Sequence, residues 1–262
     1  MIISHVSDEV KYNGSFIPYP IRENMTVANF DAFLTVFMPG NELANVRDEI
    51  DTTYASTKFN DQLNRVGILI RDAAFTCNTR QLFDAYSSSK IPIWMKNYDF
   101  LAEYDAAVHA SDLLPTFCNN DLNVADLLSN CAHVPVADAR IIGPYIRKIF
   151  APEYQSYLKS HAIYGDPNKG AQGGAKKVNW PVATTGTADI YTHVMNVMQP
   201  YYPGLIGSPF QILGQDPNNT ATSCEFWNHI ASEIIDIVGK HQQESSLVIQ
   251  DVESLPEVEL KH

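Results

Sequence analysis

Two side chains that lie far apart in the sequence could together move a proton. Glu9 follows the short apolar run "MIISHV", and His109 follows the aromatic and β-branched run "KIPIWMKNYDF". A neutral imidazole can accept a proton near neutral pH, and a neighbouring carboxylate can fix its tautomer and stabilise its positive charge. Together with a nucleophile, such a pair performs acyl transfer. An isolated histidine is more often structural. A catalytic role for the pair therefore depends on whether the elements that carry the two residues bring them together.

Both residues follow predicted strands. The run "MIISHV" has the pattern of a buried strand that leads into the acidic loop "SDE", and "KIPIWMKNYDF" is the second strand. Helical patterns lie between the two, which favours a parallel α/β arrangement. Because functional groups gather beyond the carboxyl ends of parallel strands, we expect Glu9 and His109 to meet at that edge of the sheet.

The spacing of apolar residues predicts the helices between these strands. Thr26 can cap a helix that ends before Pro39. A second amphipathic pattern covers residues 43–54, and a longer one runs from Asn60 towards Cys77. Later in the chain we expect a helix around residues 145–162, a strand in "ADIYTHVMNVM" and a helix in "SCEFWNHIASEIIDIVGK".

Composition excludes several kinds of partner. The chain has 262 residues, 45% of them hydrophobic, and a formal net charge of −12. No basic stripe could neutralise phosphates, so nucleic-acid binding and binding to anionic membranes are not expected. No run reaches the roughly 18 apolar residues of a membrane span, and the first residues lack a signal-peptide pattern.

Several stretches, taken in order, resemble one family. "MIISHVSDE" is similar to the strand and acid loop of the type-B carboxylesterases, the cholinesterase and lipase family of α/β-hydrolases, and "VHASDLLPTF" is similar to their histidine segment. The likeness continues through "AFTCNTRQLFDAYSSSKIPIWMKNYDF", "YQSYLKSHAIYGDPN" with "NWP", and "CEFWN". These stretches are most similar to the secreted fungal branch of the family, and the resemblance extends over most of residues 1–240.

The resemblance implies a fold, two catalytic residues and a covalent link. The fold would be the C-terminal half of an α/β-hydrolase, in which a mostly parallel sheet is flanked by helices. Glu9 would be the triad acid and His109 the general base, and Cys77 and Cys224 would form a disulfide bond. The substrate would be a small-molecule ester, with no cofactor. Residues 1–240 would form one domain. The last residues, 241–262, are polar, acidic and without an apolar period, which predicts a disordered tail.

The chain departs from the family at the nucleophile. In α/β-hydrolases the nucleophile precedes the acid, yet only Ser4 and Ser7 precede Glu9, and no GxSxG occurs anywhere in the chain. The glycine-rich oxyanion segment is absent too. We therefore expect an N-terminal half to be missing, an unpaired and aggregation-prone sheet edge, and negligible esterase turnover by this chain alone.

Two other types of function stay open. The chain could be a non-catalytic family remnant, or a scaffold that binds a partner protein. It could also bind a small ligand without chemistry, because a fold alone does not decide function.

Cysteines and sequons favour passage through the secretory pathway. The alternative to the disulfide between Cys77 and Cys224 is two buried free thiols, and a bond between Cys118 and Cys131 also stays open. Glycosylation could occur at the sequons of the following residues: Asn13, Asn24 and Asn218. We expect an extracellular protein.

Three further sequence patterns are too weak to predict a catalytic, metal or phosphate-binding site. "SSSK", residues 87–90, matches S-x-x-K without that motif's companions. His5 and Glu9 are four residues apart, but they lie on a strand and a loop, so they do not share a helical face as a zinc site requires. "NKGAQGGAKKVNWP" lacks the spacing of a phosphate-binding loop, and no cofactor or metal site is predicted.

Overall fold

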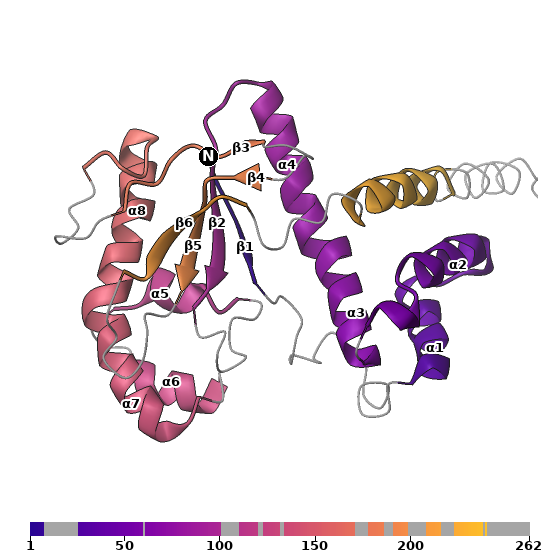
Figure 1. Cartoon of the computed structure of the whole chain (residues 1–262), viewed down its shortest axis with the longest axis horizontal. Coiled ribbons are helices and arrows are strands. Elements are labelled where there is room, and N and C mark those ends of the chain that lie inside the picture. The colour runs from indigo at the N-terminus through magenta and orange to yellow at the C-terminus, as the bar shows by residue number, and fades with distance from the viewer. Residues whose placement is uncertain are drawn as a thin grey trace, which may run out of the picture.

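The structure of the chain is a computed structural model, which describes residues 1–7, 26–59, 61–100, 110–119, 123–131, 134–170, 178–185, 191–198, 208–215, 223–237 and 239. Figure 1 shows a sheet with helices on either side, and a long helix that connects it to a group of further helices. The fold is therefore of the α/β class, as the sequence predicts.

The described residues form a sheet of four strands in the order β1-β2-β5-β6. The strands β1 (Ile2–Val6), β2 (Trp94–Asp99) and β5 (Val194–Met198) are parallel, and β6 (Phe210–Leu213) is antiparallel to β5. Among the described residues, β1 pairs only with β2. A separate two-stranded sheet pairs β3 (Thr184–Thr185) with β4 (Tyr191–Thr192). The parallel strands carry the predicted acid and base segments at one end.

Helices from the middle of the chain cover one face of the sheet. They are α5 (Leu113–Phe117), α6 (Val124–Cys131), α7 (Val136–Tyr145) and α8 (Ala151–Tyr164), with a π-helical turn (Ile146–Phe150) between α7 and α8. Their core is aromatic, and the Phe100 and Phe150 rings stack at 4.3 Å between centroids. Gly165 ends α8 with a φ of 69°, a conformation that glycine adopts without a steric cost.

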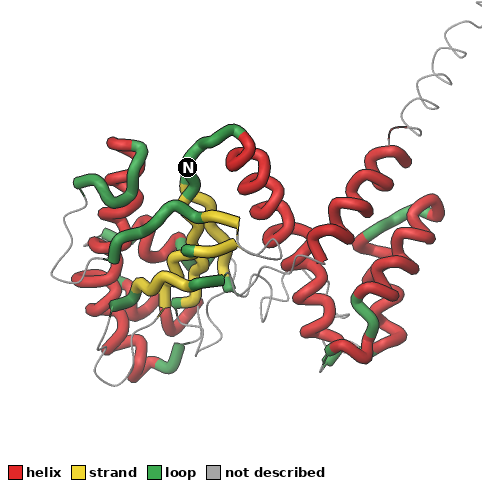
Figure 2. Tube along the Cα trace, turned by 45° about the horizontal axis from the view of Figure 1, so that its top comes forward, coloured by secondary structure: helices red, strands yellow, loops and turns green. Residues whose placement is uncertain are grey.

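The long helix lies over the other face. It consists of α3 (Gln62–Arg71), a π-helical turn (Asp72–Thr76) and α4 (Cys77–Ser88). Phe83 of α4 packs with Ile3, Met95 and Val194, which come from the three parallel strands. Because one end of this helix contacts the sheet and the other packs among helices, it connects the two parts of the molecule (Figures 1 and 2).

A second core lies entirely between helices. It is built from α1 (Val27–Phe37), α2 (Ala44–Thr53), α3 and the helix over residues 223–237, with short 3₁₀ turns at Asn41–Leu43 and Ser56–Lys58. Thr26 caps α1 as predicted, since its hydroxyl accepts a hydrogen bond of 3.3 Å from the Asn29 amide. The helix over residues 223–237, called the C-terminal helix below, contributes Trp227 and Ile230 to this core.

Within the described ranges, no helix is long and apolar enough to span a membrane. The acidic tail over residues 241–262 lies outside the described residues, as do the three sequons at Asn13, Asn24 and Asn218. The tail, the single domain over residues 1–240 and glycosylation therefore stay predictions.

Candidate active site

The carboxyl ends of β1 and β2 lie side by side. The two strands are parallel and in register from Ile2 opposite Trp94 to Val6 opposite Tyr98. The pairing extends one residue further, because the Ser7 amide donates a hydrogen bond of 2.9 Å to the Tyr98 carbonyl. The chain therefore leaves both strands at the same edge of the sheet, as Figure 1 also shows.

Glu9 and His109 themselves lie outside the described residues. The nearest described residue before Glu9 is Ser7, two positions earlier in the chain. Ala110 follows His109 directly. The structure therefore describes the end of β1 before Glu9 and the segment after His109, but neither of the two residues.

Ala110 has a backbone conformation that is unusual for an alanine. Its φ is 68°, in the left-handed region, which costs a residue with a Cβ about 1–2 kcal/mol. Its carbonyl accepts a hydrogen bond of 3.0 Å from the Leu113 amide at the start of α5. The segment directly after His109 is thus held in a strained turn, and such strain is common at functional sites.

A buried lysine ties this turn to β2. The Lys96 side chain is buried, and its Nζ lies 3.2 Å from Asp112 Oδ2. Lys96 Nζ also donates a hydrogen bond to the Tyr154 hydroxyl of α8, and it lies 4.7 Å from the centroid of the Tyr154 ring. Because Asp112 is three residues after His109, this ion pair fixes the position of the turn relative to the strand.

Helix α8 holds the far end of the same segment. The Gln155 side-chain amide donates to the carbonyl oxygens of Pro115 at 3.0 Å and Cys118 at 2.8 Å. These carbonyls lie at the end of the short helix α5, where intrahelical partners are missing. Residues 110–118 are therefore anchored at both ends.

A row of polar side chains crosses the opposite face of the sheet near the same edge. His5, Asn97 and Asn196 face one another across β1, β2 and β5, and all three are buried. The Asn97 amide donates to Asn196 Oδ1 at 2.7 Å and accepts from the Ser7 hydroxyl at 3.1 Å. These bonds fix the end of β1 just before the acidic loop.

The side chains of Ser7, Ser4 and Cys118 lack the surroundings of an activated nucleophile. Ser7 donates its proton to an amide oxygen rather than to a base, and Ser4 is exposed on β1. Burial raises the pKa of the Cys118 thiol, against a smaller opposing effect of the Arg147 charge. A raised pKa disfavours the reactive thiolate. Cys118 is a free thiol, so the bond to Cys131 that the sequence leaves open is not formed.

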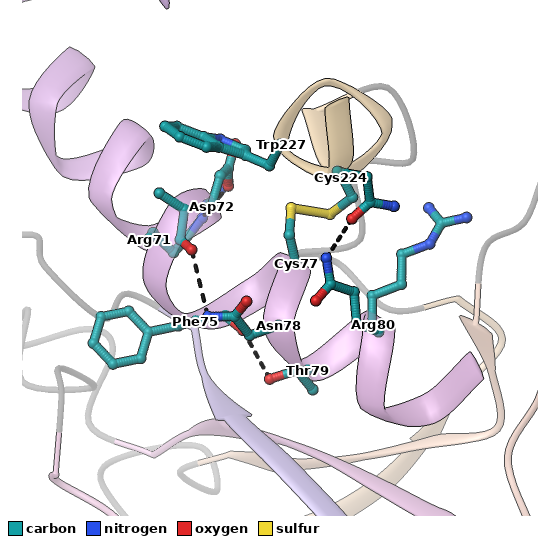
Figure 3. The surroundings of a disulfide bond; sticks show 12 residues. Arg71, Asp72, Phe75, Cys77, Asn78, Thr79, Arg80, Cys224 and Trp227 are labelled. Carbon is teal, nitrogen blue, oxygen red and sulfur yellow. Dashed lines mark hydrogen bonds and ion pairs between the residues drawn. A yellow bond between two sulfur atoms is a disulfide. The ribbon is translucent and has the colours of Figure 1, made fainter. Parts of the chain in front are cut away.

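The disulfide that the resemblance implies is present. Cys77, at the start of α4, is bonded to Cys224 in the C-terminal helix, across a sequence separation of 147. Figure 3 shows the bond beside Trp227 and the π-helical turn of the long helix. Next to it, the Trp227 indole donates to the Tyr54 hydroxyl at 2.7 Å, and that hydroxyl donates to Asp72 at 3.0 Å. Both links join the C-terminal helix to the rest of the helical core.

Sequence reasoning missed the ion pair of Lys96 and Asp112. A signal was present, because Lys96 interrupts the apolar run "IPIWM" of a predicted buried strand, and a buried lysine needs a partner. Tyr154 and Gln155 gave no such signal, because their partners depend on how α8 packs.

Comparison with known proteins gives one informative similarity. No protein-family model matches the chain. A secreted lipase of Arthroderma benhamiae is 25% identical over 238 residues, which amount to 89% of this chain and 38% of the lipase. The chain thus spans well under half of that relative's length. The similarity supports a lipase- or esterase-like origin for the α/β architecture.

Proposed function

We propose that this chain is the part of a carboxylic-ester hydrolase that carries the acid and the base. Glu9 would be the acid and His109 the base, and the nucleophilic serine would come from a segment outside the present sequence. The observation that carries the proposal is the parallel register of β1 and β2, which directs the chain towards Glu9 and His109 from neighbouring strand ends. The similarity to a secreted lipase supports it.

The described surroundings suit this role. In the complete enzyme a serine Oγ would attack the ester carbonyl, His109 would take its proton and pass it to the leaving alcohol, and Glu9 would hold the imidazole. A general base must keep its position to within a fraction of an ångström. The segment over residues 110–118, which begins directly after His109, is fixed by its contacts with Lys96 and Gln155. The polar row at Asn97 fixes the end of β1, which precedes Glu9 in the chain.

Extracellular location belongs to the same proposal. The disulfide between Cys77 and Cys224 favours an oxidising compartment, and the similar lipase is described as secreted. The substrate would be a small-molecule ester, and a missing N-terminal half would complete the sheet beside β1. Without that half, a strand edge of the sheet would be open to other chains, so we expect that the chain alone self-associates.

A non-catalytic role is the second candidate. One specific observation favours it, namely that no GxSxG occurs in the 262 residues. In that case the chain would be a remnant, or a scaffold that binds a partner or a small ligand.

One experiment separates the candidates, and a second tests whether the nucleophile lies outside the chain. The coding DNA directly upstream, read in frame, should encode a GxSxG elbow between a strand and a helix. If it does not, the enzyme proposal fails for the natural product.

The chain alone should neither hydrolyse a chromogenic short-chain ester above the buffer rate nor react with a serine-directed phosphonate. Turnover by the chain alone that His109→Ala abolishes would show that the nucleophile lies within it.

A further inference from the structure

Three side chains with metal-binding atoms converge on the surface of the helical part of the molecule. Glu49 comes from α2, and His229 and Glu233 come from the C-terminal helix. Each offers one ligand atom, and these atoms all lie within 4.8 Å of one another. We propose that they bind a divalent transition-metal ion of the zinc class, at a site separate from the candidate active site.

The type and spacing of the ligand atoms suit zinc. Zinc binds imidazole nitrogen and carboxylate oxygen at about 2.0–2.2 Å, and sites with three protein ligands hold water as the fourth. Two ligands of a tetrahedral ion at about 2.1 Å are therefore about 3.4 Å apart. His229 Nε2 and Glu49 Oε2 are 3.8 Å apart, so a small side-chain rotation closes the site. The imidazole disfavours magnesium and calcium, which prefer oxygen ligands.

The backbones that carry the ligands are already fixed relative to each other. Glu49 adjoins Ile50, and His229 adjoins Ile230, and both isoleucines are fully buried in the same helical core. His229 and Glu233 are four residues apart, so they share one face of the helix. The disulfide at Cys224 holds this helix to α4. Binding therefore requires ordering of side chains but not of backbone.

Electrostatics also favours an ion. Two carboxylates and one imidazole lie within 4.8 Å of one another, in a chain with a net charge of −12. Like charges this close repel, and a divalent cation would remove the repulsion. The ordinary alternative is an ion pair between protonated His229 and Glu49. Their side chains are 68% and 44% exposed, and an ion pair this accessible to solvent contributes little to stability.

A bound ion would have a structural consequence. It would connect α2 to the C-terminal helix and so supplement the disulfide as a second link to that helix. Because the site exists only in the folded chain, binding should stabilise the fold in proportion to the logarithm of the metal concentration.

The test is a zinc titration of the full chain, made without a polyhistidine tag because a tag would bind the probe. After treatment with a chelator, calorimetry with Zn²⁺ should show one saturable site at which Mg²⁺ does not compete. Zn²⁺ should also raise the midpoint of thermal unfolding. His229→Ala and Glu233→Gln should each lower the affinity at least tenfold, since three ligands are needed. Far-UV circular dichroism would verify that these two substitutions leave the fold intact.

Asp48→Asn is the matched control for Glu49→Gln. Asp48 is the exposed neighbour on the same helix, so both variants remove one negative charge from α2. Affinity should fall only in Glu49→Gln. The proposal is overturned if Zn²⁺ shows no saturable binding, if His229→Ala binds as the unmodified chain does, or if Asp48→Asn weakens binding as much as Glu49→Gln. The last result would indicate unspecific attraction to acidic surface.

Discussion

Lys96 illustrates how much a single side chain contributes near the candidate site. Its ammonium is buried, and its described partners are the Asp112 carboxylate and the Tyr154 hydroxyl. Breaking a buried pair by removing one partner leaves an uncompensated charge, which costs about 3–5 kcal/mol, whereas removing both charges can be nearly neutral.

The two single substitutions of this ion pair should lower stability by unequal amounts. Asp112→Asn should lower the free energy of unfolding by about 3–5 kcal/mol, because the Lys96 charge stays buried. Lys96→Met should cost less, since Asp112 is partly exposed and can be hydrated. The double variant should recover part of the loss of Asp112→Asn. Urea unfolding would measure all three, and strictly additive losses would contradict the predicted coupling.

Ala110 offers a second test at the residue scale. Glycine adopts a φ of 68° without the penalty that alanine has there. Ala110→Gly should therefore stabilise the chain by about 0.5–1 kcal/mol, after allowance for the greater entropy of an unfolded glycine. The control is Ala85→Gly in the exposed interior of α4, which should destabilise by about 1 kcal/mol. A loss of stability in Ala110→Gly would show that the turn is not strained.

The sequence identifies candidate residues by their type and position, but it does not reveal which residues they contact. Glu9 and His109 were identified because each follows a strand and because both match one family's motifs, yet their mutual distance lies outside the described residues. The pairing of Lys96 with Asp112 and Tyr154 could not be predicted, because these residues come from three elements whose packing no local pattern specifies.

At the scale of elements, the disulfide determines how firmly the C-terminal helix is held. A bond between Cys77 and Cys224 closes a loop of 147 residues, for which chain entropy gives a stabilisation of about 5 kcal/mol. The double variant Cys77→Ala, Cys224→Ala should therefore unfold at a clearly lower urea concentration. Cys118→Ser is the control, since Cys118 is free and only partly buried. An equal shift in the control would refute the special role of the bond.

Elements with a clear apolar pattern were predicted well, including the short strands β1, β2 and β5, whereas α5, α6 and β6 were not predicted. α1 has the apolar spacing and the Thr26 cap that the sequence indicates, and the long helix begins at the Asp61 cap, close to Asn60. By contrast, α5, α6 and β6 have between four and eight residues. A short element acquires its stability from tertiary contacts, and the sequence has no distinct pattern for these three, so propensity alone could not identify them.

At the scale of the whole molecule, buried tyrosines predict sensitivity to alkali. Burial raises the pKa of Tyr54, with a further contribution from the Asp72 charge, and burial and the Glu153 charge raise the pKa of Tyr145 to about 12. A raised pKa means that the folded state keeps the proton longer than the unfolded state does. This stabilisation is complete below pH 10, the usual pKa of tyrosine, and disappears as the pH rises from about 10 to about 12.

The urea midpoint should therefore be constant up to about pH 9 and then fall. In Tyr145→Phe the fall should be less steep, because one of the linked protons is absent. A tyrosinate absorbance titration should show ionisation together with unfolding. A midpoint that does not change between about pH 9 and 11 would contradict the prediction.

The central claim is that His109 is a catalytic base whose nucleophile lies outside this chain. Its most direct test is ester turnover by this chain joined to the in-frame segment that supplies a GxSxG elbow. The joined protein should hydrolyse a short-chain ester, and His109→Ala should reduce the rate by several orders of magnitude. His193→Asn is the control, because His193 is exposed and asparagine tolerates its φ of 63°. Turnover that survives His109→Ala, or its complete absence from the joined protein, would contradict the claim.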